Sequence, residues 1–527
     1  MLLLVLLGIL AILFYFLLIK PHTYWKDRWV AYEKPWPLFG SLFPVISQQQ
    51  SMAELLQGIY NKYQERYVGL YQFLLPTLIL RDPELIKQVA VKEFDSFPEH
   101  IMFAPEESDP LWAKNLFAMP GGEEWRDIRA VLSPAFTSSK LKSMFGLITK
   151  CATQFIDYIE KQGDCITLDM KDTFTKVTND IIATTAFGVT CDSFKDPNNE
   201  IFIMGKDASN LSGFLISLKF FIAAISPSLA RFLKIRFISE PTTNFFRKII
   251  KETVRVREEN EIVRPDMIHL LMEARKERLK CDEDELKEHH VSSEDKSNLG
   301  KVDRKHKTVI TDDVMTAQAV VFFLAGFDTV STAMSYTAYE LALNPEIQNR
   351  LQNEIDVTFK KCNGELTYEY LMGMKYLDMV VSETLRKWPP FAVTDRKVVK
   401  DFTIEAKYPH EKPLKVDNTV VCQIPIYSLH RDSKYFPDPE KFDPERFNDV
   451  NKQDIVPFTY LPFGAGPRNC IGSRFALLEV KVVIFHILSR FEIIPIKETH
   501  IPLILSKSNV NPVPDEGFWL GLKPRQK

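Results

Sequence analysis

The chain has 527 residues, of which 45% are hydrophobic, and its 66 Lys and Arg against 69 Asp and Glu leave a formal net charge of −3. This much apolar material excludes a disordered chain and is enough for a large core. The near-balanced charge argues against nucleic acid as a partner, because binding phosphates requires a concentrated cationic surface. The seven cysteines contain no CxxC pair, which argues against a disulfide framework or a structural zinc site.

The first nineteen residues form an uncharged apolar run, MLLLVLLGILAILFYFLLI, that ends before Lys20. As a helix this run spans roughly 28 Å, close to the hydrocarbon thickness of a bilayer. The alternative, a removed secretory signal, would have a positively charged start and a small-residue cleavage site. We therefore expect residues 1–19 to be one transmembrane anchor, with the cations after it keeping the rest of the chain in the cytosol. Residues 20–45, which include Pro35-Trp36-Pro37, are expected to form a stiff linker and hinge before the folded body, 46–527.

Hydrophobic periodicity predicts mostly helices in the rest of the chain. Apolar residues recur every three or four positions from Leu141 to Ile159, and similar stripes occur near 170–187, 244–260, 346–358 and 473–490. Short strands are expected within 67–80, broken in two by Pro76, and near 391–425. There is no βαβ alternation, GxGxxG or GxxxxGK[ST], which argues against a dinucleotide-binding fold or a P-loop. The predicted fold class is mainly α with a small β region (α+β).

Two segments have an unusual composition. Residues 276–307 are crowded with Lys, Glu, Asp and Ser, which predicts a solvated, mobile connection. Residues 201–237 are rich in Phe, Leu and Ile and carry few charges. Core burial and an exposed apolar surface that touches a bilayer both explain this second composition, and the sequence leaves the two open.

The most informative stretch is Phe463-Gly464-Ala465-Gly466-Pro467-Arg468-Asn469-Cys470-Ile471-Gly472. Its glycines and proline predict an irregular loop, and the amphipathic pattern after it places the Cys470 sulfur near a helix N-terminus. There the helix dipole and free N–H groups stabilise a thiolate, which is a soft metal ligand. Small neighbours leave room for a flat macrocycle, and Arg468 can meet an anionic group on it. The simpler interpretation is a buried structural cysteine, which the pattern F-x-x-G-x-R-x-C-x-G disfavours.

An acid and an alcohol interrupt the long apolar helix expected over Val314–Leu343. Gly326 costs about 1 kcal/mol relative to Ala inside a helix, and a carboxylate is expensive in a dry core. Thr329 lies one turn after Ala325, so its hydroxyl can bond to the Ala325 carbonyl and open room for water and a diatomic ligand. Asp328 beside Thr329 provides the groups that proton delivery requires. The alternative is a kinked core helix whose Asp reaches solvent.

These motifs, in this order, resemble those of the cytochrome P-450 family, the haem-thiolate monooxygenases, over essentially the whole chain. The resemblance implies the cytochrome P-450 fold, with residues 46–527 as a catalytic domain that inserts one atom of O₂ into a lipophilic substrate. It implies haem b whose iron is ligated by the Cys470 thiolate, and proton-relay roles for Asp328 and Thr329. The other haem contacts that it implies are Trp125, Arg129, Ala325, Arg396, Phe463, Arg468 and Gly472.

A second group of residues is expected from the same resemblance. Glu383 and Arg386, three apart on one helix face, and Arg446 resemble the buried charge network of the family, a structural element. Because buried charges are costly unless paired, losing one member is expected to be severe. Segments similar to the substrate-contact regions of the family predict a lipophilic pocket formed by Phe103, Phe117, Phe214, Phe323, Phe391, Ala392 and Val510.

The resemblance also predicts partners and a substrate class. The chain has no flavin or dinucleotide motif, so its electrons must come from NADPH through another protein. For an anchored member of the family this implies NADPH–cytochrome reductase, with cytochrome b5 as a further donor. The expected location is the endoplasmic reticulum membrane. The stretches FGAGPRNCIGSRFALLEVK and EGFWLGLKPR are most similar to insect microsomal family-nine members, a group associated with clearing plant toxins and insecticides. Oxidation of xenobiotics is the expected function. An endogenous lipid or hormone substrate, and a haem-thiolate protein that binds ligands without turnover, are the alternatives.

Overall fold

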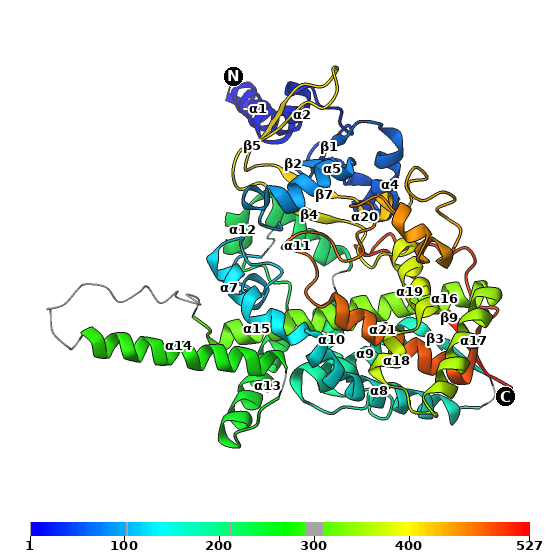
Figure 1. Cartoon of the computed structure of the whole chain (residues 1–527). Coiled ribbons are helices and arrows are strands. Elements are labelled where there is room, and N and C mark those ends of the chain that lie inside the picture. The colour runs from blue at the N-terminus through cyan, green and yellow to red at the C-terminus, as the bar shows by residue number, and fades with distance from the viewer. Residues whose placement is uncertain are drawn as a thin grey trace.

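The computed structural model describes residues 2–101, 104–163, 165–210, 212–264, 266–289 and 309–526. Their fold is mainly helical with small sheets, as predicted (Figure 1). The α-helices are α1 (Leu2–Phe14), α2 (Tyr24–Asp27), α3 (Phe43–Ile46), α4 (Met52–Lys62), α5 (Pro83–Lys87), α6 (Pro110–Ala113), α7 (Glu123–Leu132), α8 (Ser138–Glu160), α9 (Met170–Ile182), α10 (Glu200–Ser209), α11 (Phe214–Ile225), α12 (Pro227–Phe232), α13 (Glu240–Glu259), α14 (Met267–His289), α15 (Asp312–Leu324), α16 (Val330–Leu343), α17 (Pro345–Lys361), α18 (Tyr368–Met372), α19 (Lys375–Lys387), α20 (Ile426–Leu429) and α21 (Ser473–Arg490).

The strands form three sheets in the described part of the chain. The largest has the order β1 (Tyr67–Gln72), β2 (Leu75–Leu80), β7 (Val421–Ile424) and β4 (Thr394–Lys397). The second pairs β3 (Ile166–Asp169) with β9 (Trp519–Pro524) and β9 with β8 (Phe491–Ile494), and the third pairs β5 (Phe402–Ile404) with β6 (Leu414–Val416). Pro76 lies inside β2 and does not separate the strands as predicted. It precedes Thr77, where the parallel pairing with β7 begins, so its missing N–H removes no bond of that pairing.

The centre of the fold is one long helical element over residues 312–343. It consists of α15, the π-helical segment η7 (Ala325–Thr329) and α16, and it runs across the molecule between the labels α15 and α16 in Figure 1. Among the described residues it is the helix that is long and apolar enough to cross a membrane, but 67% of its apolar stretch is buried inside the protein. Helices α9, α13, α19 and α21 pack against it, which identifies it as the core helix.

The N-terminal run is helical, since α1 continues into the π-helical segment η1 (Tyr15–Ile19). Most of its described apolar side chains, from Leu2 to Ile19, are exposed. The charged stretch that begins at Lys276 was expected to be a mobile connection, but it is helical as far as His289, because α14 continues through it. Long unbranched Lys, Glu and Arg side chains favour a helix even where they cannot build a core. Residues 290–308 of the predicted connection lie outside the described residues.

The apolar segment 201–237 is partly buried in the core and partly exposed, so each of the two interpretations holds for some of its residues. Phe202 and Phe237 are buried, and the Phe221 ring packs against Phe73 at a centroid distance of 5.0 Å. Other large side chains of α11 and α12 face outward, with Phe232 82% exposed. We call this exposed set the α11–α12 patch; it consists of Leu215, Leu218, Leu229, Phe232 and Leu233.

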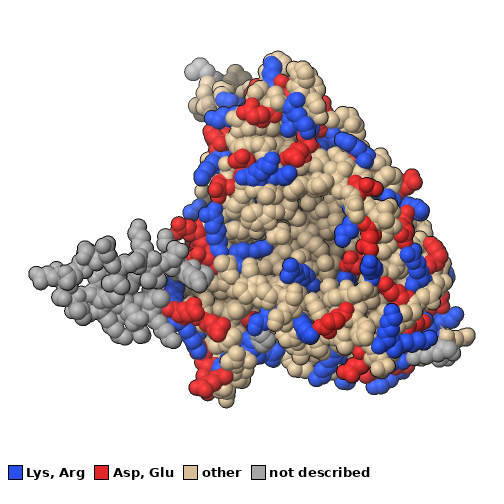
Figure 2. Space-filling view, in the orientation of Figure 1, with Lys and Arg blue, Asp and Glu red and all other residues tan. Residues whose placement is uncertain are grey.

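Charges are mixed on the face shown in Figure 2. Lys and Arg alternate with Asp and Glu around a broad uncharged area in the middle of this face. The field over this face therefore has no single sign.

Candidate active site

The loop before α21 has a backbone that only its glycines allow. Gly464 and Gly466 both have a φ of +72°, and a Cβ on Gly466 would lie 1.8 Å from the carbonyl oxygen of Ala90. The turn closes where the backbone N–H of Cys470 donates to the carbonyl of Phe463 at 2.9 Å. Gly472 is the N-cap of α21, so Cys470 lies just before a helix N-terminus, as predicted.

Cys470 is accessible to solvent, although protein closely surrounds its thiol. Burial raises its pKa, whereas the Gly472 N–H and the Arg129 guanidinium lower it. Ala325 is likewise exposed, although it lies in the middle of the core helix, two residues from the buried Phe323 and Phe327 on either side.

Arg468 and Trp125 form one unit beside this loop. The buried Arg468 guanidinium donates to the carbonyls of Pro98 and Met119, both at 2.8 Å, and lies over the Trp125 ring at 4.1 Å. Both residues also donate to the Leu116 carbonyl at 3.1 Å. Carbonyl groups of the segment before α7 therefore hold the two predicted haem contacts together.

Two further arginines reach the same loop. Arg396 is fully buried and donates from Nη2 to the Ala465 carbonyl at 3.0 Å, while its Nε–H has no hydrogen-bond partner in the described part of the chain. Arg129 donates from Nη2 to both the backbone and the side-chain oxygen of Asn469, each at 2.9 Å. The arginines predicted from the sequence are thus brought to the Cys470 loop from α7, β4 and the loop itself.

These guanidinium groups are incompletely neutralised. Burial, and then repulsion by Arg396 and Arg129, lower the pKa of Arg468 to about 9. Burial also lowers the pKa of Arg396 to about 10. A buried excess of positive charge is stabilised by an anionic partner, so this place suits a ligand that carries carboxylates.

His100 is a residue of this region that the sequence did not predict. Its Nδ1 lies 2.9 Å from Asp395 Oδ1, beside Arg396, and its ring stacks on Phe117 at a centroid distance of 4.6 Å. His100 and Asp395 are 295 positions apart. A contact between residues so far apart cannot be predicted from the spacing of motifs in the sequence.

The acid and the alcohol of the core helix lie in η7. Thr329 Oγ1 donates to the Ala325 carbonyl at 2.6 Å, and the segment between them is π-helical, which agrees with the predicted opening of the helix. The Asp328 carboxylate is directed to α9, where its Oδ1 lies 2.8 Å from the Lys171 ammonium. Lys171 also was not predicted, because it is one of several charged residues on an ordinary amphipathic helix.

The predicted charge network is assembled behind the loop. Glu383 and Arg386 are completely buried and form two hydrogen bonds of 2.8 and 2.9 Å. Arg386 also donates to the carbonyls of His430 and Pro439, and Arg446 Nε lies 3.5 Å from Glu383 Oε1. The network joins α19 to the segments that lead to the Cys470 loop.

A family profile described as Cytochrome P450 matches residues 30–519. The chain belongs to the cytochrome P450 family. Cytochrome P450 9e2 of Blattella germanica is 45% identical over 521 residues, which cover 96% of this chain and 94% of that protein. Cytochrome P450 6k1 of the same species is 39% identical over 95% of this chain and 93% of that protein. Cytochrome P450 9c1 of Drosophila melanogaster is 38% identical over 95% of this chain and 94% of that protein.

The chain is therefore a cytochrome P450 monooxygenase. Members of this family bind haem through a cysteine thiolate, and they use O₂, a small-molecule substrate and electrons from a redox partner.

The residues predicted for the substrate pocket of this cytochrome P450 lie in different surroundings. Phe323 is fully buried and packs against Phe327 and Phe246, with ring centroids 5.2 and 5.4 Å away. Ala392 is also buried, whereas Phe117, Phe391 and Val510 are about half exposed. Phe103 lies outside the described residues, and the side chain of Phe214, the first residue of α11, is not described. Their role in a pocket stays a prediction.

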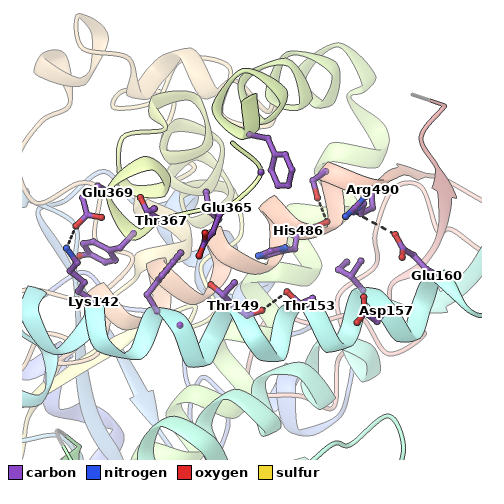
Figure 3. A pocket seen from close by; sticks show the side chains of 18 residues that line it. Lys142, Thr149, Thr153, Asp157, Glu160, Glu365, Thr367, Glu369, His486 and Arg490 are labelled. Carbon is purple, nitrogen blue, oxygen red and sulfur yellow. Dashed lines mark hydrogen bonds and ion pairs between the residues drawn. The ribbon is translucent and has the colours of Figure 1, made fainter. Parts of the chain in front are cut away.

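A groove of about 640 Å³ lies elsewhere, between α8, the loop before α18 and the end of α21 (Figure 3). Lys142 pairs with Glu369 at one end, and Arg490 lies 3.8 Å from Glu160 at the other. Its lining includes neither Cys470 nor any residue predicted for the haem or the substrate. The Cys470 loop, where a soft ligand and unbalanced cations converge, is the better candidate for the active site.

Proposed function

We propose that this cytochrome P450 is a membrane-bound monooxygenase that inserts one atom of O₂ into lipophilic xenobiotics, with Cys470 as the iron ligand. Its electrons come from NADPH through NADPH–cytochrome reductase, with cytochrome b5 as a further donor. The observation that carries the proposal is the Cys470 loop, in which a solvent-accessible cysteine lies beside buried, incompletely neutralised arginines.

The residues present fit a haem. The Cys470 sulfur is a soft donor that Arg129 and the Gly472 N–H bias toward the thiolate. Arg396, with its unpartnered Nε–H, and Arg468 supply the positive charge that the two propionate carboxylates would balance. When bound, the haem supplies the activation of O₂ and the transfer of one oxygen atom to the substrate.

The chain itself controls protons in this proposal. Thr329 Oγ1 keeps its own proton in the bond to the Ala325 carbonyl and offers its oxygen to a water molecule. The side chain of Asp328, one residue before Thr329, is 33% exposed, so water that reaches it can lead toward that hydroxyl. Asp328 and Thr329 therefore form the relay.

Two apolar surfaces support attachment to the endoplasmic reticulum membrane. The helical run 2–19 is exposed along most of its length, and the α11–α12 patch adds a second exposed apolar surface. The aromatic contact between Phe221 of α11 and Phe39, at 6.0 Å, joins that region to the linker that follows the anchor. We infer a single-pass anchor with the catalytic domain in the cytosol.

The carbon monoxide difference spectrum of the dithionite-reduced full-length protein in membranes tests the proposed ligand. A strongly red-shifted Soret band is expected from thiolate ligation. A band at the position of histidine-ligated haem, or no band, would overturn the assignment of Cys470.

Turnover of a panel of lipophilic compounds tests the substrate class. The panel contains plant toxins, insecticides, 7-ethoxycoumarin and hormone precursors, and the full-length protein is reconstituted with NADPH–cytochrome reductase. We expect several structurally unrelated toxicants to be oxidised. Oxidation of a hormone precursor alone would contradict the xenobiotic assignment, and NADPH consumption with no oxidised product would contradict monooxygenation.

A further inference from the structure

The π-helical segment η7 receives side-chain donors from a neighbouring helix. In a π turn the backbone bonds skip one residue further, so carbonyls at its end lose their regular partners. The Phe327 carbonyl accepts from Thr178 Oγ1 of α9 at 2.9 Å, and the Asp328 carbonyl accepts from Lys171 Nζ of α9 at 2.9 Å. Ser331, one turn later on the core helix, donates to both carbonyls, each at 2.9 Å. Helix α9 therefore stabilises the backbone around Asp328.

The Lys171 ammonium is enclosed by oxygen atoms. Besides the Asp328 carbonyl it contacts Asp328 Oδ1 at 2.8 Å, Ser331 Oγ at 2.7 Å and Thr332 Oγ1 at 2.8 Å. Ser331 and Thr332 are buried, and the Lys171 side chain is 23% exposed. An ammonium group has three hydrogens, so all of them are engaged by this one site.

The contact fixes the orientation of the Asp328 side chain. Lys171 binds the main chain and the carboxylate of the same residue, which leaves the carboxylate little freedom to rotate. Partial burial strengthens such a pair relative to one in open solvent. Since Asp328 precedes Thr329, the position of its carboxylate decides how protons reach the Thr329 hydroxyl.

We propose that Lys171 is a positioning residue for proton delivery, which holds the Asp328 carboxylate and the π-helical backbone in one arrangement. The inference rests on the proposed relay of Asp328 and Thr329. Without Lys171, the carboxylate turns freely, and O₂ takes up two electrons from NADPH and two protons to leave as hydrogen peroxide, with no oxygen atom transferred to the substrate.

The first test compares Lys171→Met and Lys171→Arg with Lys176→Met in the haem-loaded full chain. Lys176 is the matched control, because it lies on the same helix and pairs with the more exposed Asp172 at 2.8 Å. With reductase, NADPH and 7-ethoxycoumarin, Lys171→Met is expected to raise the ratio of peroxide to product roughly tenfold, since a displacement of about 1 Å costs up to ~100-fold in rate. Lys171→Arg is expected to recover part of the loss, and Lys176→Met to behave as the parent.

A loss of haem or stability in Lys171→Met with an unchanged peroxide ratio per haem would overturn the proposal. A Lys176→Met variant as uncoupled as Lys171→Met would do the same. The relay itself is checked separately with Thr329→Ala. If Thr329→Ala uncouples turnover and Lys171→Met does not, only the positioning role fails, and if neither does, the relay fails.

A second readout does not depend on turnover. The Tm of the haem-loaded chain is measured for Lys171→Met, Asp328→Asn and the double variant. Groups that contact each other have non-additive effects, so the double variant is expected to lose about as much as one single variant. Additive losses would show that the two side chains do not hold each other.

Discussion

Cys470 combines three properties that act on its sulfur in different directions. Burial favours the neutral thiol, while the Gly472 N–H and Arg129 favour the thiolate, and the glycines at positive φ allow the sulfur to reach the interior. The Gly472 N–H and Arg129 thus favour the anionic form that the proposed iron ligand requires. We expect Cys470→Ala to lose the red-shifted carbon monoxide band and all turnover. Cys422→Ala is the control, because Cys422 is fully buried in β7, and its spectrum is expected to remain that of the parent.

Thr329 makes a hydrogen bond that is ordinary in helices, but we propose a role in proton delivery for it. Its hydroxyl bonds to the carbonyl four residues earlier, as Thr316 Oγ1 does to the Asp312 carbonyl at 2.7 Å in regular helix. Of these two threonines, only Thr329 lies in the π-helical segment, four residues after the exposed Ala325. Thr329→Ala is expected to keep the haem spectrum but to release hydrogen peroxide, measured per NADPH consumed. Thr316→Ala is expected to stay coupled, and coupled turnover in Thr329→Ala would remove it from the relay.

At the scale of elements, the Glu383–Arg386 pair fixes α19 against the chain that leads to the Cys470 loop. Both side chains are fully buried, so removing one leaves the other charge uncompensated. We expect Arg386→Leu to lower the free energy of unfolding by about 3–5 kcal/mol. Arg255→Leu removes a partner of the same spacing from the exposed pair with Glu252, and we expect a much smaller change. Equal losses in urea denaturation of the two variants would contradict this account.

His430 makes the same region sensitive to acid. Its Nδ1 donates to the Arg386 carbonyl at 3.0 Å and its Nε2 accepts from the Leu461 N–H at 2.8 Å, an arrangement that only the neutral ring satisfies. Burial, and then the charge of Arg386, lower its pKa from 6.5 to about 3. The unfolded chain therefore takes up a proton that the folded chain refuses, and stability is lost as the pH falls from 6.5 toward 3.

For each such histidine, the free energy of unfolding is expected to fall by up to about 1.4 kcal/mol for each pH unit of acidification. Urea denaturation between pH 7 and pH 5 measures this slope. His430→Gln, whose amide can replace both hydrogen bonds, is expected to reduce it. Part of the slope remains, because burial also lowers the pKa of His486 to about 4. An unchanged slope in His430→Gln would contradict the assignment.

For the whole molecule, what the sequence predicts depends on how far apart the interacting residues lie. The bond from Thr329 to Ala325 and the position of Cys470 before α21 follow from spacing within one or two turns. The contacts of His100 with Asp395 and of Lys171 with Asp328 join positions 295 and 157 residues apart, which only the folded chain brings together. The charge-rich beginning of 276–307 was predicted as a mobile connection, but α14 continues through it to His289. Composition does not exclude a helix there, because Lys, Glu and Arg are good helix formers.

The whole molecule also presents two apolar surfaces, and their separate contributions to membrane binding can be measured. Deleting residues 2–19 removes the proposed anchor but leaves the α11–α12 patch, whose Phe232 is 82% exposed. We expect the shortened chain to sediment partly with phosphatidylcholine vesicles, because insertion of a few apolar side chains gives reversible binding. Adding Leu229→Asp and Phe232→Asp is expected to release it, whereas Val263→Asp, at an exposed apolar position in the loop after α13, is expected to have no effect. Full release of the shortened chain without these substitutions would assign membrane attachment to residues 2–19 alone.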